Sequence, residues 1–393
     1  MAEIAAMQQA LAERGLDAWL FYDHHRRDPI AYRVLGLEPG AMATRRWFYL
    51  LPAQGEPLKL VHRIEGAQLD ALPGRKRLYS SWQELAGGVE EMVRGRRRLA
   101  MQYSPNNLIP YVGLVDAGTV EMVRSFGAEV VSSADLVQLF EARWSPEALA
   151  SHLAAGRAID QIVELAFAEI GRRLPTDEFS TQQFILEEFA AAALTTEEPP
   201  IVAVNQNSGN PHYEPRRGRS WPICEGDFVL LDVWGKQNRP GAVYYDVTWV
   251  GFVAGRAVNS EPPQTIREIF GIVRSARDAG VDYVASAVRE GRRICGWQVD
   301  HVVRDFIAVR GYGQYFTHRT GHSIGERVHG NGANMDNLET KDEREIIPYT
   351  CFSIEPGIYL PEFGVRSEVN VYVDEREARV TGAIQREIVR IAG

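Results

Sequence analysis

Apolar residues recur at helical spacing along much of the second half of the chain. One such pattern begins at Ser145, a suitable N-cap, and continues with Pro146, which suits the first helical position. Pro175 ends this pattern. Similar patterns predict three further helices, over residues 181–193, 264–290 and 298–310.

Short apolar runs between and after these helices predict strands. In chain order they read PPIVAVN, DFVLLDVWG, AVYYDVTWVGFVA, CFSIEPGIYL and VRSEVNVYV. Helices that come in pairs beside such strands are typical of an α+β fold. We expect the strands to form one strongly curved antiparallel sheet with the helices packed against it.

The first part of the chain has a different pattern, in which short apolar runs alternate with helical stretches. The runs LDAWLFYD, RRWFYLLP and LKLVHRIE come first, and AEVVSSADLVQLFEARW closes the region. This alternation predicts a small α/β domain. We therefore expect two domains, over residues 1–140 and 141–393.

The composition is that of an ordinary globular protein, with 45% hydrophobic and 24% charged residues. The net charge of −9 argues against a nucleic-acid partner, and the basic run RGRRR at 94–98 is more typical of a solvated face. No apolar run is long enough to span a membrane, and the chain starts without the apolar stretch of a signal peptide. The three cysteines have no framework spacing, so we expect a cytoplasmic protein with no membrane partner.

Carboxylates inside the predicted strands are the first sign of chemistry. Asp232 and Asp246 are flanked by apolar or aromatic residues, and so are Glu355 and Glu368. Acidic residues are disfavoured in mid-strand, and an unpaired buried carboxylate costs several kcal/mol. Each residue alone could simply point to the solvent face of a half-buried strand. If both pairs form hairpins, however, four carboxylates could converge on the concave side of one sheet.

Four like charges cannot share a dry site unless cations neutralise them. With one imidazole added, the ligand set suits two divalent ions of the hard-to-borderline class. Three of the nine histidines, His318, His322 and His329, lie within residues 316–330. The HExxH zinc motif is absent there, and nearby glycines argue against a regular helix. One of these histidines could be a ligand, and each could also be a structural residue.

The motifs PPIVAVNQNSGNPHYEP, FVLLDVWG, YYDVTW, HRTGHSIGERVH, SIEPGIY and GVRSEV occur in the order found in the pita-bread metallopeptidases. The chain resembles this family, which includes Xaa-Pro aminopeptidases and prolidases, and its first part resembles the creatinase-type N-terminal domain. The resemblance implies a pita-bread catalytic domain preceded by a smaller α/β domain.

The resemblance also implies roles for particular residues. The metal ligands would be Asp232, Asp246, His322, Glu355 and Glu368, with Asp246 and Glu368 bridging two divalent ions. Manganese is the first choice, and cobalt, zinc or iron are alternatives. The residues that bind substrate, assist proton transfer or orient the site would be His212, His318, His329, Glu355 and Arg366.

The implied activity is hydrolysis of the bond between an N-terminal residue and proline, by attack of a metal-bridging hydroxide. The substrate would be a small peptide with proline in second position, and the enzyme would be a homodimer. The sequence does not separate a Xaa-Pro dipeptidase from a Xaa-Pro aminopeptidase. Two other interpretations stay open: a C–N hydrolase or metal-dependent lyase acting on a small non-peptide substrate, and a non-catalytic binding protein of the same fold.

Several positions depart from the family pattern. The segment between Asp232 and Asp246 is longer than usual, and Trp249 stands where an arginine is common. Ser323 replaces a glycine, and Ser367 and Val369 flank the last glutamate where isoleucine and aspartate are common. These changes leave the ligands intact and bear on the identity of the substrate.

Overall fold

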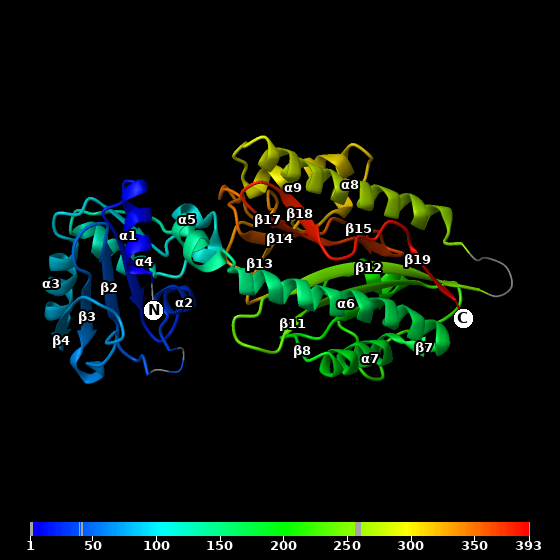
Figure 1. Ribbon diagram of the computed structural model, residues 1–393, viewed down its shortest axis with the longest axis horizontal. Coiled ribbons are helices and arrows are strands. Elements are labelled where there is room, and N and C mark those ends of the chain that lie inside the picture. Colours follow the sequence, from blue (N-terminus) through cyan, green and yellow to red (C-terminus); the bar gives the residue numbers. More distant parts are fainter. Residues whose placement is uncertain (1–2, 39, 41, 256–260, 393) are drawn as a thin grey trace. The chain divides into compact units, whose positions relative to one another are not determined.

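The structure, a computed structural model, describes residues 3–38, 40, 42–255 and 261–392 of the chain. It divides into two compact units, Met1–Glu141 and Ala142–Gly393, which we call the N-terminal unit and the C-terminal unit (Figure 1). None of the helices in the described residues has both the length and the apolar character needed to cross a bilayer.

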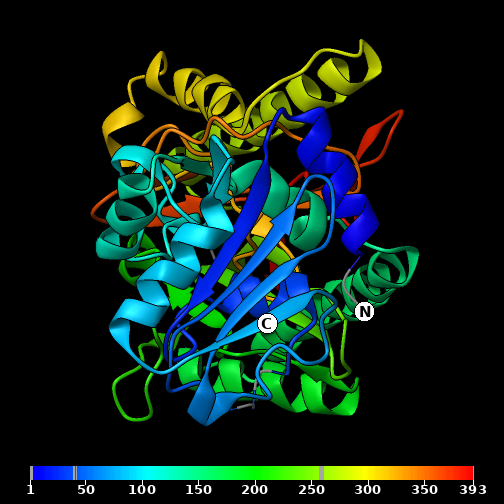
Figure 2. The same ribbon diagram turned by 90° about the vertical axis from the view of Figure 1, so that its left-hand side faces the viewer.

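The N-terminal unit contains a six-stranded sheet with the strand order β4-β3-β2-β1-β5-β6. Figure 2 shows strands of this sheet side by side, in blue. Only β2 runs antiparallel to its neighbours, so the carboxyl ends of the other five strands share one edge. The strands are β1 Ala18–Asp23, β2 Trp47–Pro52, β3 Leu58–His62, β4 Arg75–Tyr79, β5 Arg98–Met101 and β6 Glu129–Ser132.

Helices cover both faces of this sheet. They are α1 Ile4–Glu13, α2 Pro29–Leu35, α3 Trp82–Val93, α4 Ala117–Ser125 and α5 Ala134–Val137. Successive side chains of a strand point to opposite faces, and along β1 every one of them is buried. Trp19 and Phe21 belong to one apolar cluster, whereas Leu20 and Tyr22 belong to another. The sheet therefore separates two cores.

In the C-terminal unit, four long helices flank several short sheets. The helices are α6 Pro146–Arg172, α7 Glu178–Ala191, α8 Gln264–Arg289 and α9 Gly296–Ala308. The four predicted helices are thus confirmed. Ser145 caps α6 by accepting a hydrogen bond from the Ala148 N–H. The second helix begins earlier than predicted, because Asp177 caps it at the Ser180 N–H.

The expectation of one continuous sheet is wrong. The strands form a five-stranded sheet (β19-β12-β11-β8, with β9 on β11), a four-stranded sheet (β13-β14-β17-β18) and two strand pairs, β15-β16 and β7-β10. Glu355 and Pro356 interrupt the run between β14 and β15, since proline cannot donate to a ladder. Ser367 and Glu368 interrupt the run between β16 and β17.

The bounds of these strands are β7 Thr176–Asp177, β8 Leu194–Thr195, β9 Ile201–Val204, β10 Pro222–Ile223, β11 Phe228–Gln237, β12 Tyr245–Ala254, β13 Ser323–Ile324, β14 Thr350–Ile354, β15 Gly357–Tyr359, β16 Gly364–Arg366, β17 Val369–Val373, β18 Ala378–Thr381 and β19 Val389–Ala392.

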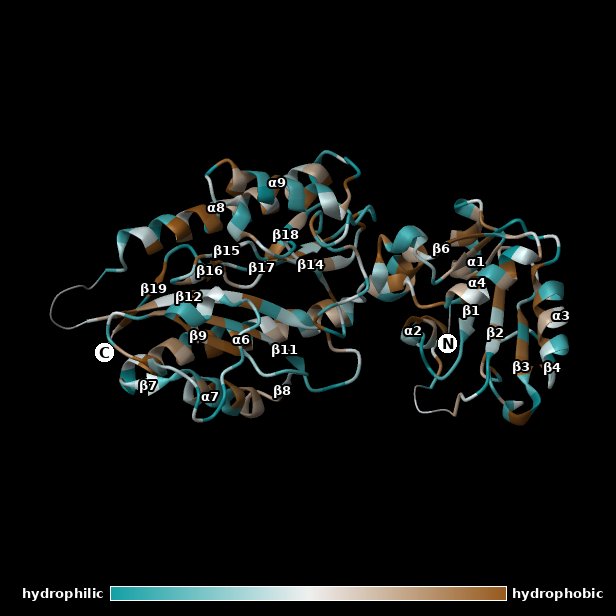
Figure 3. Cartoon of the chain, turned by 180° about the vertical axis from the view of Figure 1, so that it is seen from behind, coloured by the Kyte–Doolittle hydropathy of each residue, from teal (hydrophilic) through white to brown (hydrophobic). Residues whose placement is uncertain are grey.

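The two helix pairs lie on opposite sides of the strands (Figure 1). Apolar residues of α6 and α7 pack against β9, β11 and β12. Residues of α8 and α9 pack against β14 and β17, and against the other face of β11 and β12. Teal and brown stretches along α8 in Figure 3 reflect its amphipathic pattern. Both faces of β11 and β12 are consequently covered.

Gly156 allows α6 to approach β12 closely. A Cβ atom at this position would lie 2.8 Å from the ring of Tyr245. This ring cannot easily move away, because its hydroxyl donates a hydrogen bond to Asp160 at 2.7 Å. The residue after Tyr245 is Asp246, so this contact fixes the start of the strand that carries a candidate ligand.

We expect Gly156→Ala to destabilise the protein by about 1–3 kcal/mol, because overpacking outweighs the gain in helix propensity. Gly271→Ala is the matched control in α8, since no atom lies within 4 Å of its Cβ position. It should stabilise by about 0.4–1 kcal/mol. Denaturant midpoints followed by circular dichroism measure both changes. Stabilisation by both substitutions would contradict the proposed contact.

Candidate metal site

The β11–β12 hairpin carries both aspartates on one face. Asp232 pairs with Thr248 across the two antiparallel strands, and Asp246 lies two residues before Thr248. Because alternate residues of a strand share a face, all three side chains point the same way. The opposite face, with Val233 and Val247, packs in the core formed with α6 and α7. The aspartates therefore occupy mid-strand positions and are buried, as their sequence context suggested.

The two glutamates lie at breaks between strands and not inside them. Glu355 directly follows β14, and Glu368 directly precedes β17. These strands are antiparallel, and their last pair joins Ile354 to Val369. Glu355 and Glu368 are therefore next to each other just beyond the end of the ladder. The interrupted strands leave both carboxylates free to turn toward β12.

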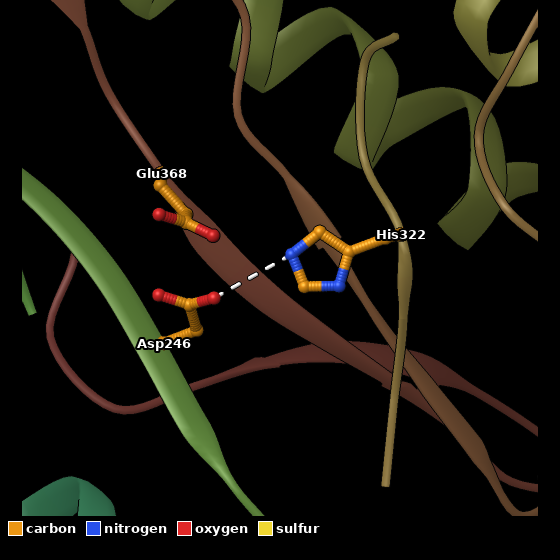
Figure 4. A group of neighbouring side chains, drawn as sticks. All are labelled: Asp246, His322 and Glu368. Atoms are coloured by element: carbon orange, nitrogen blue, oxygen red, sulfur yellow. Dashed lines mark ion pairs between the residues drawn. The ribbon is translucent and has the colours of Figure 1, made fainter. Parts of the chain in front are cut away.

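Carboxylates from both sheets meet the imidazole of His322. Ligand atoms of Asp246, His322 and Glu368 all lie within 4.8 Å of one another (Figure 4). His322 Nε2 is 3.5 Å from Asp246 Oδ2 and 3.4 Å from Glu355 Oε1. The Thr248 hydroxyl lies 2.7 Å from Asp232 Oδ1 and 2.9 Å from Glu368 Oε2. The structure thus brings all five predicted ligands into one cluster.

The orientation of His322 leaves one ring nitrogen facing the carboxylates. Its Nδ1 lies 3.1 Å from the carbonyl oxygen of Ser323, which fits a protonated Nδ1. The lone pair of Nε2 then points into the cluster, as a metal ligand requires. The backbone N–H of His322 donates to Ser353 Oγ, which in turn donates to Glu355 Oε1.

The charges of this cluster are not balanced by the side chains around it. Burial and the neighbouring Asp232 and Glu355 raise the pKa of Asp246 well above its usual range. Burial and the Asp246 carboxylate do the same to the pKa of Glu368. Asp246 Oδ1 and Glu368 Oε1 are buried and have no hydrogen-bond partner among the described residues. An oxygen-rich, negatively charged cluster with two unpaired acceptors fits divalent cations.

Arg366 lies on the Asp232 side of this cluster. Its guanidinium contacts Asp232 and donates to the Thr248 hydroxyl at 2.8 Å. The two histidines His322 and His318, together with Arg366, also favour the ionised form of Glu355. Burial opposes ionisation of Glu355, but these three groups outweigh it and lower its pKa. Glu355 is therefore the carboxylate that stays ionised beside the histidines.

A cavity of about 390 Å³ opens next to the cluster. All five residues predicted to assist catalysis line it, as does His322. The lining residues are Asn210, Pro211, His212, Thr317, His318, Arg319, His322, His329, Glu339, Glu355 and Arg366. The ring of His329 lies edge-on to that of His322, with centroids 4.4 Å apart. His212 is exposed at the cavity.

His318 is held in a neutral state. Burial lowers its pKa to about 4. Its Nδ1 lies 2.7 Å from the Arg319 carbonyl oxygen, and its Nε2 lies 2.7 Å from the hydroxyl of Tyr359. The Arg366 guanidinium donates a hydrogen bond to the same hydroxyl at 3.4 Å. Tyr359 therefore connects His318 with Arg366.

Sequence reasoning missed Thr248, Tyr359 and Glu178. The role of Thr248 could have been predicted from the sequence, because Thr248 lies two residues from Asp246 and therefore on the same face of the strand. Glu178 had no such sequence signal, since an acidic residue in a first helical turn is ordinary. It is fully buried, and it accepts hydrogen bonds from the Val204 N–H, the Asn207 amide and the Tyr213 hydroxyl. These bonds hold the loop that carries His212.

Two departures from the family pattern lie away from the cavity. Trp249 points to the face of β12 that packs against the α6 and α7 core. In the extension between β11 and β12, Val243 and Tyr244 are buried in a cluster with Trp144 and Tyr372. Trp249 and these residues of the extension thus pack in apolar cores. None of them lines the cavity.

Ser367, another departure, contacts a buried charge. Arg277 of α8 is 1% exposed and donates to Ser367 Oγ at 2.7 Å and to the Gln385 carbonyl oxygen at 3.0 Å. Ser367 lies between Arg366 and Glu368, in the break that precedes β17. Arg277 therefore supports this break from the side opposite the carboxylates.

Comparison with known proteins agrees with this architecture. The profile of metallopeptidase family M24 matches residues 150–375. The chain is 34% identical over 169 residues to a Xaa-Pro dipeptidase of Lactobacillus delbrueckii subsp. lactis, covering 43% of this chain and 40% of the relative. It is 28% identical over 245 residues to a Xaa-Pro dipeptidase of Lactobacillus helveticus, covering 62% and 60%. The chain thus spans about half the length of these relatives.

Solved structures match nearly the whole chain. The dipeptidase PepE from Mycobacterium ulcerans has a TM-score of 0.71 at 22% identity, covering 99% of this chain and 97% of that one. A recombinant prolidase from Thermococcus sibiricus has a TM-score of 0.66 at 22% identity, covering 98% and 97%. The predicted pita-bread fold with a preceding α/β domain is confirmed.

We expect Arg277→Met to weaken binding of Mn²⁺ by about tenfold, because outer groups that orient ligands have effects of this size. Titration of metal-depleted protein by calorimetry measures the affinity. Arg274→Met is the control on the same helix, since Arg274 donates to the Arg386 carbonyl oxygen and not to the strand break. Equal affinities in both variants would argue against a supporting role for Arg277.

Proposed function

Because the chain belongs to metallopeptidase family M24, we propose that it is a metal-dependent hydrolase of Xaa-Pro bonds, a dipeptidase or an aminopeptidase. The observation that carries this proposal is the cluster around His322. Asp246 and Glu368 each keep a buried oxygen without a hydrogen-bond partner among the described residues, and ligand atoms of both lie within 4.8 Å of a ring nitrogen of His322. Such an arrangement is unfavourable unless cations occupy it.

In this proposal Asp232, Asp246, His322, Glu355 and Glu368 would hold two divalent ions, with manganese as the first choice. Asp246 and Glu368 each keep one carboxylate oxygen without a hydrogen-bond partner among the described residues, and these oxygens would be available to the ions. Arg366 neutralises part of the charge of Asp232 and holds its carboxylate in place. Ser353 and Ser323 orient Glu355 and His322 respectively.

When bound, the ions would polarise the scissile carbonyl and lower the pKa of a water molecule. Glu355 stays ionised at the cavity, so it can take a proton from the attacking water and deliver it to the leaving nitrogen. His329 and His212 line the same cavity and can donate hydrogen bonds to the carbonyl oxygen as charge develops. Donors aimed at such charge are each worth about 3–4 kcal/mol.

The substrate in this proposal is a small peptide with proline in second position. An Xaa-Pro bond is a tertiary amide without an N–H, so it must be recognised by the groups around it and not by strand pairing. The cavity of about 390 Å³ suits a ligand of a few residues at most. His318 is neutral and both of its ring nitrogens are engaged, by the Arg319 carbonyl oxygen and the Tyr359 hydroxyl, so it presents an uncharged ring surface to such a ligand.

The alternative of a non-peptide substrate has little support. It rested on Trp249 and on the longer β11–β12 connection, and both complete apolar cores away from the cavity. The alternative of a non-catalytic binding protein is disfavoured by the intact set of five candidate ligands. We further propose a cytoplasmic homodimer, which is consistent with the three free cysteines and with the family resemblance.

Asp246→Ala should lower kcat/KM by about 1,000-fold or more, since it removes a ligand that both ions share. Hydrolysis of a Xaa-Pro dipeptide with added Mn²⁺, together with metal content after dialysis, measures the effect. Asp305→Ala is the control, because Asp305 is exposed on α9. Near-normal turnover of the Asp246 variant with undiminished metal would refute the assignment.

A series of peptide lengths separates the two activities. A dipeptidase should hydrolyse Xaa-Pro at least tenfold faster than Xaa-Pro-Yaa. An aminopeptidase should prefer the longer peptide, because its cleft continues beyond the site that binds proline. Rates with Mn²⁺, Co²⁺ and Zn²⁺ also rank the metals. Hydrolysis of small amidines alone, with no Xaa-Pro cleavage, would overturn the proposed substrate class.

A further inference from the structure

The N-terminal unit contains a second large cavity, of about 770 Å³. Its wall includes the last residue of β3, His62, and the last residue of β4, Tyr79, as well as Tyr22 near the end of β1. These three strands are mutually parallel, so the cavity lies at the carboxyl edge of the sheet. In open α/β sheets this edge is where ligands bind.

Basic side chains outnumber acidic ones in the lining of this cavity. Six of them come from three segments of the N-terminal unit: His24, His25, Arg27, Arg45, Arg46 and His62. The whole chain has a net charge of −9, so this concentration does not follow from composition. Burial, and then the charges of His25, Arg27 and Arg46, lower the pKa of His24, which reflects the positive field in the cavity.

The guanidinium groups of Arg27, Arg45 and Arg46 form no ion pair with any carboxylate of the described residues. Of the three, Arg45 has a nearby carboxylate on which its charge acts, that of Glu65. The nearby carboxylates are already satisfied by other donors. Asp23 accepts from the Arg26 and Asp28 N–H groups and the Tyr32 hydroxyl.

The other acids near the cavity are also engaged. Glu65 accepts from the Thr44 N–H and hydroxyl and from the Arg45 N–H. Asp116, which lines the cavity, caps α4 by accepting from the Thr119 N–H and hydroxyl. Glu84 closes a capping box at the start of α3. The helix ends are therefore filled by their own acids, and the uncompensated charge belongs to the arginines.

We propose that this cavity binds a small, multiply charged oxyanion, carried on a ligand with phosphoryl or carboxylate groups. Arginine matches the geometry of both groups through paired N–H donors. The volume suits a small molecule. Trp82 at the rim is 71% exposed and offers an aromatic surface to the rest of the ligand. Nothing in the Xaa-Pro hydrolase proposal requires such a site.

Calorimetric titration of the metal-loaded protein tests this proposal, with inorganic phosphate and succinate as separate probes at constant ionic strength. Arg27→Gln/Arg46→Gln should weaken binding of the preferred probe by about tenfold or more, since hydrogen bonds to charged groups are lost. Arg27→Gln alone should weaken binding several-fold, and because Arg27 is exposed this variant guards against misfolding.

The matched control is Arg75→Gln/Arg94→Gln, which removes the same charge from the same unit. Arg75 begins β4 and so lies at the opposite edge of the sheet, and Arg94 is exposed after α3. Any binding of the probes to the C-terminal unit is common to all variants. Tighter binding of phosphate or of succinate identifies the preferred group. Equal affinities in the cavity and control variants, or no binding of either probe, would overturn the site.

Discussion

Mutual repulsion among Asp232, Asp246 and Glu368 is the constraint on which the C-terminal unit depends. All three carboxylates are buried, and two of them keep an acceptor oxygen without a partner. A fold tolerates such a cluster only if cations or protons neutralise it, because uncompensated buried charges cost several kcal/mol each. The free energy of ion binding then adds to the stability of the folded state. The site and the fold are therefore coupled energetically.

The architecture supplies the rigidity that this cluster requires. Regular β-structure carries Asp232 and Asp246, whose positions follow from the register of one hairpin. Interrupted β-structure carries Glu355 and Glu368, whose side chains would alternate away from the site in a continuous strand. Buried groups outside the cluster then fix each interruption. Ser353 donates a hydrogen bond to Glu355 at the first interruption, and Arg277 donates one to Ser367 at the second.

Much of this was predictable from the sequence, for identifiable reasons. The helix that begins at Ser145 has strong periodicity and a cap, so its start was predicted correctly. The aspartates were visible because acidic residues are rare in apolar strands. The division into separate sheets could not be predicted, since CFSIEPGIYL has the pattern of one strand and its pairing depends on strands distant in the sequence. The support from Arg277 was invisible because 90 residues separate it from Ser367.

Charged side chains are arranged in opposite ways in the two units. In the C-terminal unit the negative groups are buried, and Arg366 balances only part of their charge, so that bound cations are suited to balance the rest. In the N-terminal unit, positive groups line a more open cavity, so the proposed anion would be held by partly screened charges. A buried cluster of charges favours an ion that stays bound. A solvated cluster favours a ligand whose binding follows its concentration in solution. The first arrangement suits a resident cofactor, and the second suits a ligand that comes and goes.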